Sequence, residues 1–350
     1  MDIIKLFATA GALFFCSAAI ADSTVMGMGA GGLEFRATDK VSMVKELLTI
    51  SPQKIDAQYV FKNVTAQPVE LLVAFPLPVI DFSKKNPRGP YTNIPNPNQE
   101  NFVEFHTRVN GQPVQTKVDT KALVGDRDIS SELKKLGISY WIPGHGFNED
   151  RTVQKQLAAL SKSAQHHLEK TGVIELGPEG DDSFPYPRWR LVTLYYWTQN
   201  FPVGQDVNIQ HVYRPLPALS EGFSSWLQDA NGKPVRLSAF NGSPEARYPK
   251  GGANLKEYCM TEGFWKLAQS KKDIWAYQSS EIDFILKTAN AWHKPIGEFT
   301  LVIETLRPET LVSICMDGIK QTGPTSFTVT KHNFAPTQDI RLFFLVKVRN

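Results

Sequence analysis

The first residues that suggest chemistry are glycines near the start of the chain. Gly27, Gly29 and Gly32 have the spacing G-x-G-x-x-G, which in dinucleotide-binding proteins holds a phosphate between a strand and the N-terminus of a helix. Here an apolar leader precedes the glycines, and residues 33–36 after them alternate apolar and polar, as in a strand. The run therefore predicts extended or turning backbone, and we expect no nucleotide and no other cofactor.

His145 is the histidine with the most site-like surroundings. It lies in the stretch IPGHGFNED, near Glu149 and Asp150, and an imidazole beside carboxylates is a common acid–base or metal-binding pair. His106 is predicted on a polar strand face, and His166 and His167 on the surface of a helix. His211 is predicted in the core. The sequence favours an ordinary polar loop around His145, so no catalytic residue and no metal ion is predicted.

Local signatures of common enzymes are missing from the sequence. The chain contains no G-x-S-x-G elbow, no H-E-x-x-H helix and no P-loop, which are the local marks of many hydrolases and phosphotransfer enzymes. These absences do not exclude a catalytic triad assembled from distant segments of the chain. The sequence favours a protein that binds over one that catalyses.

Two cysteines follow the leader, Cys259 and Cys315. An even pair in an exported protein is usually oxidised, so a disulfide between them is predicted, and a pair of buried thiols is the alternative. Such a bond would close a loop of about 57 residues and stabilise the fold by roughly 4 kcal/mol in the chain-entropy model.

A candidate interaction loop is the stretch ANAWHKPIGEF, residues 289–299. Trp292 offers a flat aromatic face, His293 adds a polar group, and Pro295 stiffens the exit of the loop. The alternative is that the Trp292 indole plugs one end of a β-sandwich.

The elements that must position these groups are mostly strands. Apolar residues alternate in KIDAQYVFKN (54–63) and PVELLVAFPLP (68–78), Asn110-Gly111 indicates a hairpin, and RWRLVTLYYWTQNF (188–201) is apolar on both faces like a central strand. Residues 126–172 indicate helices. Asp128 is a predicted cap, and one apolar stripe contains Val153, Leu157, Leu160, Ala164 and Leu168.

The pattern predicts a mainly β protein with an antiparallel β-sandwich architecture, two sandwich-like units and a helical insertion. The predicted regions are a signal peptide (1–21), an N-terminal β-sandwich-like region (22–125), the helical insertion (126–188) and a C-terminal β-rich region (189–350). The signal peptide is predicted from Lys5, from an apolar stretch too short to span a bilayer, and from the A-x-A pattern of Ala19-Ile20-Ala21. An uncleaved anchor is the alternative.

The overall charge is close to neutral. The 350 residues contain 38 Lys and Arg against 35 Asp and Glu, a formal net charge of +3. A balance this close to neutral gives no electrostatic reason to expect nucleic acid as a partner. No integral membrane segment is expected once the signal peptide is cleaved.

Several blocks of the sequence together resemble a bacterial exported family that carries only the label "domain of unknown function". They are DSTVMGMGAGGLEF (22–35), YVFKN (59–63), FPLP (75–78), YYWTQNFPVGQDVNIQHVYRP (195–215) and FILKTANAWHKPIGEF (284–299). The Y-x-F-x-N, F-P-L-P and V-N-G-Q-P-V pattern is also similar, more weakly, to the VIT domains, which are β-sandwiches used in interactions. The resemblance implies a periplasmic location for the protein. It implies no activity, because the family has none established.

The expected function is therefore a non-catalytic binding or interaction module of the cell envelope. Its partner would be an envelope protein or a glycan. A hydrolase acting on an envelope polymer and an accessory subunit of an envelope complex are the alternatives.

Overall fold

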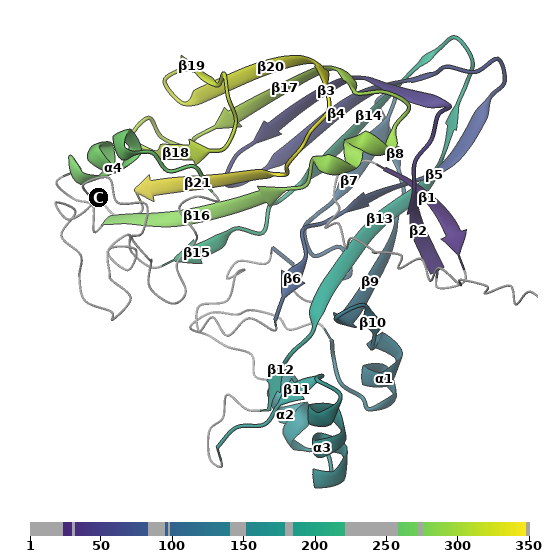
Figure 1. The fold of residues 1–350 in the computed structure, drawn as a ribbon, viewed down its shortest axis with the longest axis vertical. Coiled ribbons are helices and arrows are strands. Elements are labelled where there is room, and N and C mark those ends of the chain that lie inside the picture. Colours follow the sequence, from purple (N-terminus) through teal and green to yellow (C-terminus); the bar gives the residue numbers. More distant parts are fainter. Residues whose placement is uncertain are drawn as a thin grey trace, which may run out of the picture.

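The computed structural model describes residues 24–29, 32–82, 95–96, 99–140, 152–178, 185–220, 258–271 and 276–347. Most strands in this part of the chain belong to three sheets of eight, seven and four strands (Figure 1). The mainly β class and the sandwich-like, largely antiparallel arrangement predicted from the sequence are confirmed. Within these residues, no helix is both long and apolar enough to cross a bilayer.

The eight-stranded sheet carries the candidate site. Its order is β19 (Lys320–Gly323), β20 (Ser326–Phe334), β17 (Ile296–Glu304), β3 (Val41–Ile50), β4 (Ile55–Asn63), β14 (Asp206–Tyr213), β7 (His106–Val109) and β8 (Gln112–Val114). Along β4, Ile55, Ala57, Tyr59 and Phe61 are buried, while the residues between them are more exposed, as the alternation predicts. One pair, β3 with β17, is parallel. Side chains alternate between the two faces of a strand in parallel and antiparallel sheets alike. The alternation in the sequence therefore could not show that β3 and β17 run parallel.

The seven-stranded sheet contains the glycine run. Its order is β10 (Arg127–Asp128), β9 (Lys117–Val124), β13 (Arg190–Phe201), β5 (Val69–Pro76), β1 (Thr24–Gly29) and β2 (Gly32–Arg36), and β6 (Ile80–Asp81) also pairs with β13. Gly27 and Gly29 lie in β1 and Gly32 lies in β2, which pairs antiparallel with β1. The prediction of extended backbone is confirmed, because the glycines belong to two paired strands and not to a turn before a helix.

The four-stranded sheet completes the sandwich. Its order is β15 (Ala218–Ser220), β16 (Tyr277–Phe284), β21 (Ile340–Lys347) and β18 (Leu311–Ile314). Phe75 on β5 links the three sheets, because its ring centroid lies 5.5 Å from that of Tyr213 on β14 and 6.2 Å from that of Phe284 on β16. The inner faces of the three sheets therefore share one apolar core.

Strands from either side of residue 189 pair with one another. The predicted central strand β13 lies between β9 and β5, and β14 lies between β4 and β7. In Figure 1 the teal β13 and β14 accordingly run among the purple and blue strands of the first half of the chain. The proposed division of the chain at 189 therefore does not separate one sheet from another.

The predicted helical insertion contains α1 (Ser130–Lys135), α2 (Thr152–Ala158) and α3 (Lys162–Lys170), beside the short pair β11 (Ile174–Glu175) and β12 (Tyr186–Pro187). These elements lie together at one end of the molecule (Figure 1). Asp128 does not occupy the N-cap of α1, which is Ile129. The Asp128 Oδ1 atom instead accepts a hydrogen bond from the Ser130 backbone N–H at 2.9 Å.

The predicted apolar stripe from Val153 to Leu168 packs against the core, but it is divided between two helices. The Ser161 hydroxyl accepts from the Ala164 N–H at 3.2 Å and begins a new helix. The buried Gln165 amide donates to the carbonyl groups of Leu157 and Ala158, at 3.1 and 3.0 Å. These bonds satisfy the backbone where α2 ends, so the chain breaks into two short helices.

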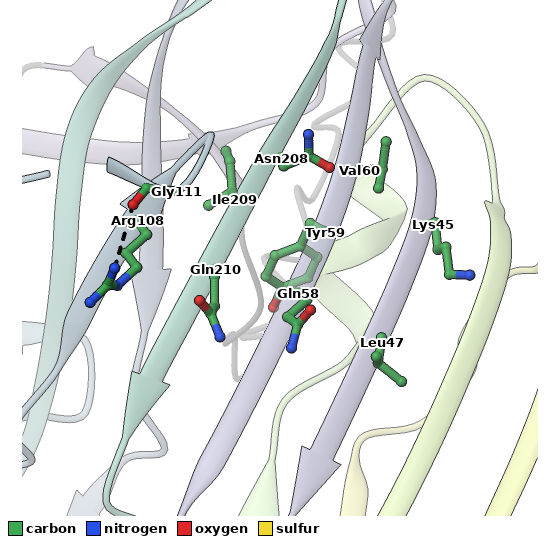
Figure 2. Close-up of a pocket in the computed structure, with 10 residues that line it drawn as sticks. All are labelled: Lys45, Leu47, Gln58, Tyr59, Val60, Arg108, Gly111, Asn208, Ile209 and Gln210. Carbon is green, nitrogen blue, oxygen red and sulfur yellow. Dashed lines mark hydrogen bonds between the residues drawn. The ribbon is translucent and has the colours of Figure 1, made fainter. Parts of the chain in front are cut away.

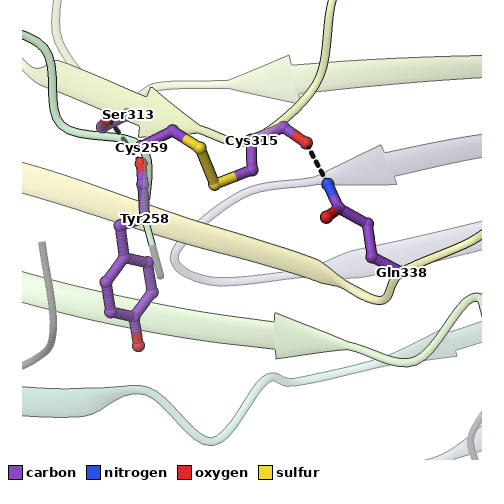
Figure 3. The surroundings of a disulfide bond; sticks show 5 residues. All are labelled: Tyr258, Cys259, Ser313, Cys315 and Gln338. Carbon is purple, nitrogen blue, oxygen red and sulfur yellow. Dashed lines mark hydrogen bonds between the residues drawn. A yellow bond between two sulfur atoms is a disulfide. The ribbon is translucent and has the colours of Figure 1, made fainter. Parts of the chain in front are cut away.

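The disulfide between Cys259 and Cys315 is present, as predicted (Figure 3). It connects β18 to the segment that leads into α4 (Glu262–Gln269). The Ser313 hydroxyl donates to the Tyr258 carbonyl at 2.8 Å, and the Tyr258 ring lies 5.9 Å from that of Phe343 on β21. The disulfide thus holds this segment over one face of the four-stranded sheet.

A β-bulge in β3 sets the direction of the side chains after it. The pairing of β3 with β4 shifts between Met43 and Lys45, so Val44 and Lys45 are both exposed and Glu46 points into the core. The neighbouring residue on β17 is Gly297, where a Cβ atom would overlap the Val44 carbonyl oxygen. Glycine is therefore required at 297, and the bulge turns Lys45 toward solvent.

Candidate functional site

A groove of about 230 Å³ crosses the outer face of the eight-stranded sheet (Figure 2). It lies over β3, β4, β14 and β7. Its polar side chains are Lys45, Gln58, Asn208, Gln210 and Arg108, and its apolar ones include Leu47 and Val60. Typical sites for drug-sized ligands measure about 300 to 1,000 Å³, so this groove suits a small group or one unit of a longer ligand.

The β7–β8 hairpin places Arg108 beside the groove. Its turn residues Asn110 and Gly111 have φ values of 50° and 80°, as the predicted Asn-Gly hairpin requires. Asn110 is fixed to β14, because its N–H donates to the Asn208 carbonyl at 2.8 Å and its Oδ1 accepts from the Asn208 N–H at 2.9 Å. Arg108 is paired with Gln210 in the register of β7 and β14. The hairpin therefore holds the guanidinium at the groove.

Lys45 is already neutralised by a carboxylate. Its Nζ atom lies 2.7 Å from Oε1 of Glu298 on β17. The hydrogen bond and charge of Lys45, and more weakly the charge of His332, lower the pKa of the Glu298 carboxyl. Arg108, by contrast, makes only a long hydrogen bond of 3.4 Å to the Gly111 carbonyl, and no described residue forms a salt bridge with it. Arg108 thus supplies the uncompensated positive charge of the groove.

The glutamines in the groove have fixed orientations. The Gln58 and Gln210 side-chain amides both donate to Asp56 Oδ1, at 3.2 and 2.9 Å. Because each Nε2 points at Asp56, each carbonyl Oε1 is left as an acceptor for a ligand. The Asn208 side-chain amide has no hydrogen-bond partner among the described residues, so it offers a donor and an acceptor.

An aromatic cluster lies behind the groove, on the inner face of the same strands. His211 on β14 is fully buried, and its Nδ1 lies 3.0 Å from the Thr107 hydroxyl. The rings of Tyr59, Phe75 and Phe105 lie 5.7, 4.9 and 5.1 Å from the imidazole. Burial lowers the pKa of His211 from 6.5 to about 3. The prediction of a hydrogen-bonded core histidine is confirmed.

The burial of His211 predicts a loss of stability in mild acid. The unfolded chain takes up the proton near pH 6.5, whereas the folded protein resists it until about pH 3. The stability due to neutral His211 is therefore complete above pH 6.5 and decreases as the pH falls toward 3, by up to about 1.4 kcal/mol per pH unit. Lowering the pH from 7 to 5 should cost about 2 kcal/mol through this group.

Urea unfolding of the wild type and of His211→Gln, at both pH values, measures this effect. The wild type should lose about 2 kcal/mol more than the variant, because glutamine does not titrate. An identical pH dependence in the two proteins would show that His211 is accessible to protons in the folded state.

Of the two predicted roles for Trp292, the structure supports the core plug and not the displayed side chain. The stretch begins in the 3₁₀ helix η4 (Lys287–Ala291), and Trp292 after it is 4% exposed. Its ring lies 4.5 Å from that of Phe61 and 6.2 Å from that of Phe201, so the indole plugs the core. The next residues, His293 and Pro295, are exposed, and the His293 N–H donates to the Val41 carbonyl at 3.0 Å.

The polar loop that contains His145, Glu149 and Asp150 lies outside the described residues, so its predicted role is untested. His166 and His167 are exposed on α3, and His106 is exposed on β7. No group of three or more His, Cys, Asp or Glu side chains within the described ranges could hold a metal ion.

The sequence reasoning missed the groove residues. Gln58, Asn208 and Gln210 stand at outward positions of correctly predicted strands, and this alternation was the available signal. The sequence does not show, however, that β3, β4, β14 and β7 are neighbours.

Comparison with known families identifies the chain. The model of one family matches residues 21–343, nearly the whole length. The chain belongs to DUF4424, a domain of unknown function. This membership confirms the predicted relationship to a domain-of-unknown-function family. No curated protein sequence matches this DUF4424 chain.

Solved structures similar to this DUF4424 protein are distant. A Legionella pneumophila protein, whose suggested role is nutrient binding, matches with a TM-score of 0.42 and 14% identity, over 92% of this chain and 72% of that one. An M1 zinc metallopeptidase from Deinococcus radiodurans matches with a TM-score of 0.28 and 8% identity, over 89% of this chain. The chain spans only 43% of that peptidase. At these values the matches carry no information on ligand or activity.

Proposed function

We propose that this protein is an exported, periplasmic binding protein of the cell envelope, and that the groove on the outer face of the eight-stranded sheet is its ligand site. The observation that carries the proposal is the set of available polar groups there. The Asn208 amide and the carbonyl oxygens of Gln58 and Gln210 have no partner among the described residues, and the Arg108 guanidinium has only its long bond to Gly111. Fixed polar groups around a small concavity are typical of ligand sites.

Two further features support an exported protein. The leader of residues 1–21 has the composition of a signal peptide. The Cys259–Cys315 disulfide fits an oxidising compartment such as the periplasm. A binding role also fits the described residues better than catalysis, because the groove lining contains no Ser, Thr, Cys or His side chain, and its lysine is paired with Glu298.

A panel of envelope components tests the proposal. Neutral glycans, acidic glycans, peptidoglycan fragments, amino acids and short peptides are titrated into the purified wild type and into Asn208→Trp, whose indole should fill the groove. Thr330→Trp is the matched control, because Thr330 is exposed on the same sheet face but two strands beyond β3 and outside the groove. Both surface substitutions should change the free energy of unfolding by no more than about 0.5 kcal/mol.

At least one class should bind the wild type and Thr330→Trp equally and bind Asn208→Trp at least about tenfold more weakly. If the filled groove binds as well as the open one, or if no class binds the wild type, the proposed function is wrong.

A further inference from the structure

We infer that the ligand of the groove is a carboxylated sugar, such as one uronic acid unit of an acidic polysaccharide. The inference rests on the proposed function and names its ligand class. It follows from the charge of the groove, from its hydrogen-bonding groups and from its place in the middle of a sheet face.

The charge of the groove favours a ligand with a single anionic group. Lys45 is neutralised by Glu298 at 2.7 Å, and the Asp56 carboxylate accepts from two amides and lies 3.5 Å from Lys54. Arg108 remains as the cation without a carboxylate partner among the described residues. A guanidinium binds a carboxylate through two parallel N–H donors, which favours a ligand with one carboxylate at this position.

The glutamine carbonyl oxygens in the groove favour a ligand that also donates hydrogen bonds. Gln58 and Gln210 each present a carbonyl oxygen and one remaining N–H, because each NH₂ group donates only one of its two hydrogens to Asp56. Figure 2 shows Arg108, Gln210 and Gln58 side by side on three neighbouring strands. Ionised phosphate oxygens only accept hydrogen bonds, so a phosphate would match the remaining N–H groups but would leave both carbonyl oxygens without a donor. Sugar hydroxyls donate and accept, and they match both the glutamines and the free Asn208 amide.

The position of the groove disfavours an extended peptide. Peptides commonly bind a sheet by adding a strand at its edge, where backbone groups are unpaired. The strands under this groove, β3, β4 and β14, are paired on both sides. Leu47 and Val60 are half-buried in the groove and offer an apolar surface for the C–H face of a sugar ring. With about 230 Å³ the groove holds one ring of a longer chain.

Calorimetric titration with three oligomers of four units tests the inference. The probes are tetragalacturonate, its fully methyl-esterified form, which keeps the hydroxyls and loses the charge, and tetraglutamate, which keeps the charge and lacks the hydroxyls. Tetragalacturonate should bind, and each of the other two should bind at least about tenfold more weakly. Added salt should weaken the binding of tetragalacturonate.

Substitutions at Arg108 test whether this residue binds the carboxylate of the ligand. Arg108→Gln should reduce the affinity for tetragalacturonate about tenfold and leave the weak affinity for the ester unchanged. Arg108→Lys should give an intermediate loss, because lysine keeps the charge but not the planar pair of donors. Thr330→Trp should bind tetragalacturonate as the wild type does.

The outcomes separate the inference from the proposed function. If tetragalacturonate does not bind, or if the ester or tetraglutamate binds as tightly, the ligand class is wrong. The ligand class is also wrong if Arg108→Gln does not change the affinity for tetragalacturonate. In these cases the proposed function still stands if another class of the panel binds the wild type and not Asn208→Trp. If Asn208→Trp binds tetragalacturonate normally, both the site and the inference are wrong.

Discussion

Replacing Trp292 with alanine should lower the free energy of unfolding by about 3 to 5 kcal/mol, the usual cost of removing a buried tryptophan. The indole is 4% exposed, and it fills the space between Phe61 on β4 and Phe201 on β13. Its removal leaves a cavity between two sheets that these rings cannot fill. Urea unfolding followed by circular dichroism measures the loss.

His293→Ala is the matched control, because His293 is the next residue and is exposed. It should change the free energy of unfolding by no more than about 0.5 kcal/mol. A Trp292→Ala protein as stable as this control would show that the indole is displayed on the surface, as the interaction-loop hypothesis requires.

Removing the disulfide should have an effect of similar size. The bond joins residues 56 positions apart, and for a loop of this length the chain-entropy model gives a stabilisation of roughly 4 kcal/mol. The double variant Cys259→Ala/Cys315→Ala should therefore unfold at a much lower urea concentration than the wild type. Non-reducing peptide mass spectrometry should find the two cysteines in one cross-linked peptide.

Ser313→Ala serves as the control for the disulfide. It removes the 2.8 Å hydrogen bond to the Tyr258 carbonyl in the same contact and keeps the disulfide (Figure 3). Its cost should be about 1 kcal/mol. If the double cysteine variant loses no more than Ser313→Ala, the hydrogen bonds and the packing of Tyr258 hold this segment without help from the disulfide.

Local patterns in the sequence predicted local features well. The alternation in residues 54–63 predicted β4, and Asn110-Gly111 predicted the hairpin, because both depend on the chain within a few residues. Trp292 was harder to place, since its burial depends on Phe61 and Phe201, which are far from it in sequence. Its neighbours His293 and Pro295 are exposed, so the surrounding sequence gave no sign of the buried indole.

The groove could not be predicted for the same reason. Gln58 and Gln210 share Asp56 only because β4 and β14 pair, although they are about 150 residues apart in the chain. Lys45 points outward because of the bulge opposite Gly297, which breaks the alternation of β3. Knowledge of the sheet order is therefore needed before the outward residues of the separate strands can be recognised as one site.

The most direct test of the central claim follows the side-chain amides of the groove by nuclear magnetic resonance. The NH₂ signals of Gln58, Asn208 and Gln210, assigned through single substitutions, should shift when tetragalacturonate or the best ligand of the panel is added. The NH₂ signal of Asn290, which donates to the Pro336 carbonyl at 2.9 Å away from the groove, should stay in place. If a saturating ligand leaves the three groove signals unmoved, the ligand site lies elsewhere on the protein.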